Sequence, residues 1–142
     1  MKDFHDRYVE TEKGFKLLET ISIQTDIKGF SLHTEFVSLT VDGLLTIRAG
    51  FLWNASGPTI DTKNTREATC YHDAIYVLAN FGLFNGPCAQ SVRKKADVLM
   101  YRMLRKNGMM WIRAKIWYRS VRMFGNSYWE KNKRRFKGMR RR

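Results

Sequence analysis

The 142-residue chain contains very little cysteine, and the spacing of its cysteines excludes the sites that cysteine usually builds. Cys70 and Cys88 are too few for a disulfide framework, and neither belongs to a paired zinc-binding spacing. On a helix, Cys70 and His72 would point about 200° apart, so they could not share a metal ion. We therefore expect both thiols to be small buried hydrophobic groups in a reducing compartment.

Long hydrophobic runs are also missing. The N-terminus has no apolar stretch, so we expect no signal peptide. Residues 74–92 carry no charged side chain, but Asn80, Gly82 and Pro87 interrupt them. We expect this segment to fold within the protein and not to span a membrane.

Acidic residues are scarce in the second half of the chain. Residues 1–73 hold 8 Lys/Arg and 11 Asp/Glu, whereas residues 74–142 hold 18 and 2, and the net charge is +13. This asymmetry is typical of a surface that binds a polyanion, which could be nucleic acid, an anionic membrane or an acidic protein. A basic face that is merely solvated is the alternative.

The first half of the chain contains strand patterns. Alternating or apolar segments occupy residues 17–25, 32–40 and 44–53. The Asp42-Gly43 pair between two of them is a strong hairpin signal. These patterns predict a small antiparallel sheet over about residues 15–53.

Helical patterns follow. Asn64 suits an N-cap, with Glu67 completing a capping box, and this first helix would end near Gly82. A second helix is predicted over about residues 89–106, and a third over 111–124 with Gly125 as its end.

A hydrophobic content of 44% and this length indicate one globular α+β domain over residues 1–125. Residues 126–142 form a basic tail, and we expect residues 131–142 to be disordered alone.

Four polar residues on the first two predicted helices could form a catalytic site. His72 and Tyr76 lie about 40° apart on one helix, and Asp73 turns to an adjacent face. Asp97 or Tyr76 could orient the His72 imidazole as a general base. The competing interpretation is a satisfied structural network between packed helices.

Two further regions could bind ligands. The loop at residues 54–58 joins a strand to the helix of His72, where active-site loops are common, although tight turns use the same residues. The basic region could contact phosphates or lipids. Its candidate anion-binding residues are Arg113, Lys115, Arg119, Arg122, Lys131, Lys133, Arg134, Arg135, Lys137, Arg140, Arg141 and Arg142.

The chain resembles a known family over about residues 15–125. The segments that carry the likeness are residues 50–58, 71–76, 96–97 and 114–125. They are similar to a family from tailed phages and prophages known as domain of unknown function 1353. The resemblance implies a phage origin, hence a location in the virion or the host cytoplasm, and it supplies no activity.

A more remote likeness concerns the helix pair. Gly57-Pro58, Ala68, His72-Asp73, Tyr76 and Ala96-Asp97 resemble the phospholipase A₂ core, especially that of parvovirus capsids. This resemblance implies that His72 is the base, with Tyr76 and Asp97 as its supports. It also implies calcium at Asp73, for which Asn54 is the other candidate ligand. The sequence departs from those enzymes at residues 51–56, which lack the glycines of their calcium loop, and in the strands before the site.

We therefore expect a phage-encoded, hydrolase-like protein that acts on an ester, with a phospholipid as one candidate. The alternative is a non-enzymatic virion or DNA-associated protein. Its basic half would bind nucleic acid, a membrane or another phage structural protein, and an inhibitor of a host protein is a third option.

Overall fold

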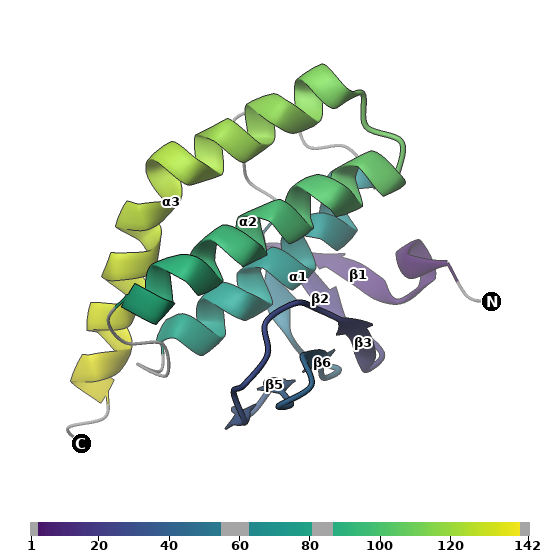
Figure 1. Cartoon of the computed structure of the whole chain (residues 1–142). Coiled ribbons are helices and arrows are strands. Elements are labelled where there is room, and N and C mark those ends of the chain that lie inside the picture. The colour runs from purple at the N-terminus through teal and green to yellow at the C-terminus, as the bar shows by residue number, and fades with distance from the viewer. Residues whose placement is uncertain (1–2, 55–62, 81–86, 140–142) are drawn as a thin grey trace.

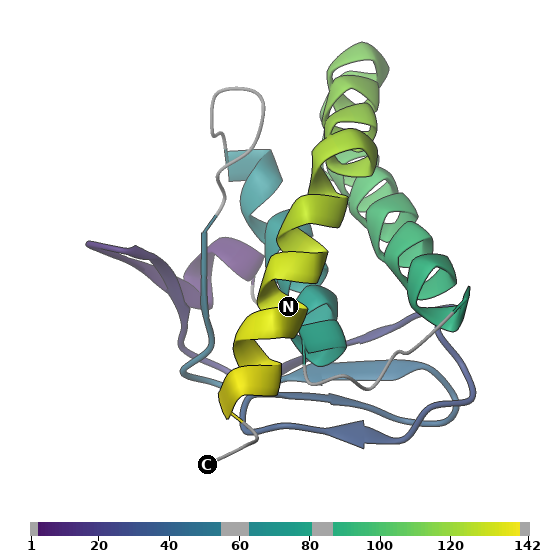
Figure 2. The same ribbon diagram turned by 90° about the vertical axis from the view of Figure 1, so that its left-hand side faces the viewer.

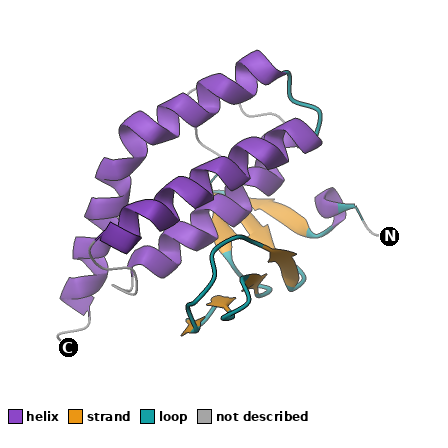
Figure 3. Ribbon diagram, in the orientation of Figure 1, coloured by secondary structure: helices purple, strands orange, loops and turns teal. Residues whose placement is uncertain are grey.

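Two small antiparallel sheets followed by three helices make up the fold (Figures 1 and 3). The computed structural model describes residues 3–54, 63–80 and 87–139, with side chains for residues 3–54, 65–79 and 89–125. This architecture confirms the α+β class. The elements are η1 (Phe4–Asp6), β1 (Tyr8–Thr11), β2 (Gly14–Leu17), β3 (Ile21–Gln24), β4 (Leu32–His33), β5 (Val37–Leu39), β6 (Leu44–Ile47), β7 (Leu52–Trp53), α1 (Lys63–Asn80), α2 (Pro87–Lys106) and α3 (Trp111–Met139).

The strands form two sheets, where the sequence predicted one. Their orders are β1-β2-β7 and β3-β6-β5-β4, with every pair antiparallel. The β5–β6 pairing around Asp42-Gly43 confirms the predicted hairpin. The β1–β2 hairpin was not predicted. Its turn needs Gly14, since φ is 140° there and a Cβ would meet the Trp53 carbonyl oxygen at 2.4 Å.

Helix α1 is the central element, because it contacts both sheets and both other helices. Ala74, Ile75 and Leu78 on this helix are fully buried, as are Val37, Leu45 and Ile47 on the four-stranded sheet. His72 therefore belongs to a helix that is enclosed by protein on most sides. Among the described residues, no helix has the length and apolar character needed to cross a membrane.

The helix boundaries differ from the predicted ones at two places. Helix α1 begins at Lys63, so Asn64 lies inside it and is not the N-cap. The Glu67 carboxylate accepts a hydrogen bond from the Asn107 amide at 3.0 Å, a tertiary contact that the capping pattern did not anticipate. The predicted cap at Gly82 lies outside the described residues, as does most of the loop at 54–58.

Helix α3 continues through Gly125 to Met139, so the prediction that it ends at Gly125 is wrong. An isolated glycine costs a helix about 1 kcal/mol and does not by itself terminate it. The expected disorder of the tail also differs from the structure, where the backbone is helical as far as Met139. Figures 1 and 2 show that α3 first runs beside α2 and then changes direction.

Candidate active site

A buried carboxylate on α2 lies where all three helices meet. Asp97 is fully buried. Its Oδ1 accepts a hydrogen bond from His72 Nε2 at 2.6 Å and another from the Tyr76 hydroxyl at 2.9 Å. His72 and Tyr76 come from successive turns of α1, and their rings lie 4.3 Å apart between centroids. One oxygen of Asp97 thereby fixes both side chains.

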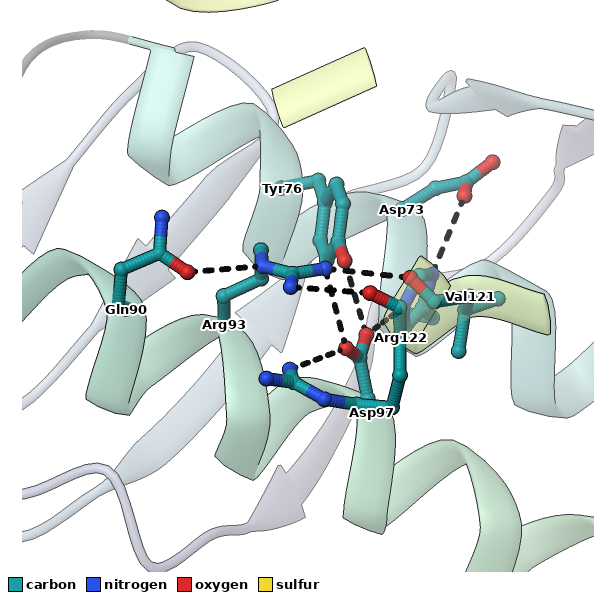
Figure 4. Close-up of polar contacts among 8 residues, drawn as sticks. Asp73, Tyr76, Gln90, Arg93, Asp97, Val121 and Arg122 are labelled. Atoms are coloured by element: carbon teal, nitrogen blue, oxygen red, sulfur yellow. Dashed lines mark hydrogen bonds and ion pairs between the residues drawn. The ribbon is translucent and has the colours of Figure 1, made fainter. Parts of the chain in front are cut away.

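The second carboxylate oxygen faces two arginines. Arg122 Nη1 on α3 donates to Asp97 Oδ2 at 2.8 Å, and Arg93 Nη1 lies 3.5 Å from the same oxygen. Figure 4 shows these side chains converging on Asp97 from different helices. Because the imidazole, the hydroxyl and two guanidinium groups share one carboxylate, Asp97 is the electrostatic centre of the helix bundle.

Arg93 also joins α2 to the backbone of α3. Its Nη1 donates to the Val121 carbonyl at 3.1 Å and its Nη2 to the Arg122 carbonyl at 3.3 Å, while Nε donates to Gln90 Oε1 at 3.2 Å (Figure 4). A guanidinium that donates hydrogen bonds to the backbone carbonyls of a helix competes with the internal hydrogen bonds of that helix. Such competition is a known cause of helix bending. We attribute the change in direction of α3 to these contacts.

The other nitrogen of His72 faces Asp73, which lines a surface cavity. Nδ1 lies 3.8 Å from Asp73 Oδ1, which is an ion-pair distance and too long for a hydrogen bond. The Asp73 side chain is 25% exposed and also accepts a hydrogen bond from the Asn54 backbone N–H. It lines a cavity of about 230 Å³ together with Asn54, Trp53, Thr11 and Lys13. The Asp73 side chain thus lies between His72 and the solvent in this cavity.

The charges at this site reinforce one another. Burial lowers the pKa of His72, but Asp73 and Asp97 outweigh it and raise the pKa to about 9. Burial raises the pKa of Asp97, yet the bonds from His72, Tyr76 and Arg122 leave it below its usual range. The imidazole is therefore cationic at neutral pH and paired with Asp97. For Asp73, burial raises the pKa against the opposing effects of His72 and Asn54.

The structure brings together all five residues that the sequence singled out as catalytic or metal-binding. His72, Tyr76 and Asp97 share hydrogen bonds, and Asp73 and Asn54 meet at the cavity.

The predicted anion-binding residues separate in the structure. Arg122 turns inward to Asp97 and is only 29% exposed at its side chain, while Lys115 and Arg119 are exposed on α3. The candidates in the tail have side chains outside the described part of the chain. Sequence analysis also missed Arg93. Its position four residues before Asp97 on one helix was the available signal, since such pairs face each other.

The calcium site expected at Asp73 and Asn54 stays a prediction. No group of three or more His, Cys, Asp or Glu side chains among them is arranged to hold a metal ion. Calcium takes about six to eight oxygen ligands, and the side chains with oxygen atoms that line the cavity are those of Asp73, Asn54 and Thr11, together with the cation Lys13.

The chain was compared with protein-family models, with curated proteins and with solved structures, and none of them matches. The two resemblances drawn from the sequence therefore stay predictions.

Replacement of Gly125 by alanine tests the close packing of α3 on this site. A Cβ at Gly125 would lie 2.9 Å from the Tyr76 hydroxyl and 3.1 Å from Arg93 Nη1. Glycine-to-alanine changes inside helices usually stabilise by about 1 kcal/mol. Here we expect a loss of about 1–3 kcal/mol in urea denaturation, because both neighbours are buried and hydrogen-bonded. Ser120→Ala on the same helix is the control, and a stabilising Gly125→Ala would contradict the packing described.

Proposed function

We propose that this protein is a hydrolase that cleaves an ester, with His72 as its general base. The observation that carries the proposal is that the two imidazole nitrogens of His72 have different partners. Nε2 is held by Asp97 at 2.6 Å, while Nδ1 faces Asp73 at the edge of a cavity. A base needs one nitrogen fixed by a partner and the other directed toward the reacting water.

The chemistry follows from this geometry. In neutral His72, Nε2–H donates to Asp97 and the Nδ1 lone pair accepts a proton from a water molecule in the cavity. The water oxygen forms a bond to the ester carbonyl carbon, and the carbonyl oxygen takes up the negative charge. When the carbonyl re-forms, the bond to the alcohol breaks, and the imidazolium returns its proton to the departing alkoxide. Asp97 and Asp73 stabilise the imidazolium that exists between these steps.

The rate should depend on pH in a way that a purely structural network would not produce. Only the neutral imidazole can accept a proton, and the pKa of His72 is about 9. We expect kcat/KM on a p-nitrophenyl ester, or on a short-chain phospholipid, to rise with pH up to an apparent pKa near 9. His72→Gln should lower the rate by about 100-fold or more.

Asp73→Asn provides the decisive variant, because its side chain is partly exposed and the fold should tolerate it. Losing this carboxylate removes one of the two groups that raise the pKa of His72. The pH–rate profile should therefore move to lower pH. Asp26→Asn, an exposed carboxylate elsewhere, should leave the profile in place. Absence of esterase activity, or a profile that Asp73→Asn does not shift, would refute the proposal.

A further inference from the structure

Helix α3 exposes large apolar side chains on its outer side. Ile112, Ile116 and Met123 are 52%, 47% and 71% exposed. Ile112 and Ile116 lie about 40° apart around the helix axis, and Met123 follows after the Arg93 contacts to Val121 and Arg122. Ala114 and Trp117, on the opposite side of the helix, are buried against the rest of the protein. Trp111 and Phe124 at the two ends of this segment are also exposed, by 57% and 69%. We call Ile112, Ile116 and Met123 the apolar stripe of α3.

Cations border the apolar stripe. Lys115 and Arg119 lie along one edge and Arg113 along the other at the helical spacing of about 100° per residue. No Asp or Glu occurs between Asp97 and Glu130 in the sequence. Over residues 111–125, where the structure describes its side chains, the helix thus combines an exposed apolar line with positive charge on both sides and carries no acidic residue.

The position of α3 leaves this face accessible. Figures 1 and 2 show the first half of α3 at the end of the molecule away from the four-stranded sheet. The helix packs on α1 and α2 through its inner side. The apolar stripe therefore lies on the outer side of α3, away from α1 and α2.

We propose that α3 docks this protein on an anionic lipid bilayer. Helices that lie in a bilayer interface carry bulky apolar residues on one face, with Lys and Arg beside them, which is the arrangement found here. Nucleic acid would use the cations but would gain little from Ile112, Ile116 and Met123, whereas acyl chains take up such side chains favourably. This inference goes beyond the proposed ester hydrolysis and does not depend on it.

Sedimentation with vesicles tests the docking surface. The full chain is mixed with vesicles of phosphatidylglycerol and phosphatidylcholine, and with vesicles of phosphatidylcholine alone. We expect binding to the anionic vesicles that weakens as salt is added. The double variant Ile112→Ser/Ile116→Ser should lower the partition coefficient by about tenfold or more. Lys115→Gln/Arg119→Gln should lower it by about tenfold, on anionic vesicles only.

A matched double variant controls for the loss of exposed apolar surface. Leu18→Ser/Val41→Ser removes two side chains that are 53% and 57% exposed on the sheet side of the protein. It should bind vesicles as the unmodified chain does. The urea denaturation midpoints of all variants should agree, since none of these residues is buried.

Three results would overturn the inference. If the Ile112/Ile116 and Leu18/Val41 variants bound vesicles equally well, the apolar stripe would not contribute to membrane binding. Binding to duplex DNA but not to anionic vesicles would mean that the cations of α3 bind nucleic acid and not lipid. A dimer in light scattering that Ile112→Ser/Ile116→Ser dissociates would make the stripe a contact between copies. His72→Gln should retain vesicle binding, so failure of the hydrolase proposal and failure of docking are distinguishable.

Discussion

Replacement of Asp97 by asparagine is expected to lower the free energy of unfolding by about 3–5 kcal/mol, as breaking a buried ion pair from one side usually does. The amide keeps the shape of the carboxylate but loses its charge. The Arg93 side chain is only 5% exposed and would lose its carboxylate partner, while His72, 9% exposed, would keep only Asp73 at 3.8 Å. Two buried cations near one another also repel. Urea denaturation, monitored by circular dichroism, gives the change in midpoint at constant slope.

The exposed carboxylate of Asp26 is the matched control for this substitution. Asp26 is 77% exposed at its side chain and lies 3.7 Å from Arg102. Exposed pairs of this kind contribute about 0–1 kcal/mol, so Asp26→Asn should leave the midpoint nearly unchanged. Arg122→Gln, which removes a partly exposed partner of Asp97, should lie between the two. Equal midpoints for Asp97→Asn and Asp26→Asn would show that the helix junction does not depend on this charge.

Stability should fall as the solution is made alkaline, because His72 holds its proton more tightly in the folded protein. Its pKa is about 9 when folded and 6.5 when exposed. A raised pKa contributes stability that is fully present below pH 6.5 and is lost as the pH rises through about 9. The pKa difference corresponds to about 3 kcal/mol in total. We expect about 2 kcal/mol of this to be lost between pH 6.5 and 8.5, in urea denaturation at each pH.

His72→Gln isolates this contribution, because glutamine does not titrate. The variant should be less stable at pH 6.5 and should lose much less stability by pH 8.5. Above that range Cys70 adds a similar slope, since burial also raises the pKa of its thiol. Cys70→Ala therefore accompanies the measurement. A His72→Gln variant as sensitive to pH as the unmodified chain would mean that the imidazole is neutral in the folded protein.

Local patterns predicted the secondary structure where the local signal was strong. The Asp42-Gly43 hairpin and the three helices follow from turn chemistry and apolar periodicity. The division into two sheets could not be predicted in this way. It depends on the pairing of β7 with β2, and these two strands are far apart in the sequence. The length of α3 was missed for a related reason. Gly125 resembles a helix end by its local preference, whereas the tertiary neighbours Tyr76 and Arg93 require a residue without a side chain there.

The candidate site was predictable to the extent that its residues are close on one helix. His72 and Tyr76 share a face by helical spacing, and Asp97 was predicted as a possible partner because it is the carboxylate on the next predicted helix. Arg122 was predicted to bind an external anion, and its pairing with Asp97 could not be predicted from the sequence. It lies among many cations, and only the packing of α3 directs it to Asp97 instead of to solvent. The raised pKa of His72 follows from two carboxylates converging on one ring, which requires the folded arrangement of α1 and α2.

The junction at Asp97 also has a consequence for the order in which the chain folds. Its hydrogen-bonded partners lie 21 to 25 residues away on both sides, on α1 and α3. Single helices and pairs of neighbouring strands can form before these contacts exist, whereas the junction needs all three helices docked. Contacts that form after the transition state change the rate of unfolding more than the rate of folding. Contacts at Asp97 would then slow the detachment of α3 from the other two helices during unfolding and have little effect on the rate of folding.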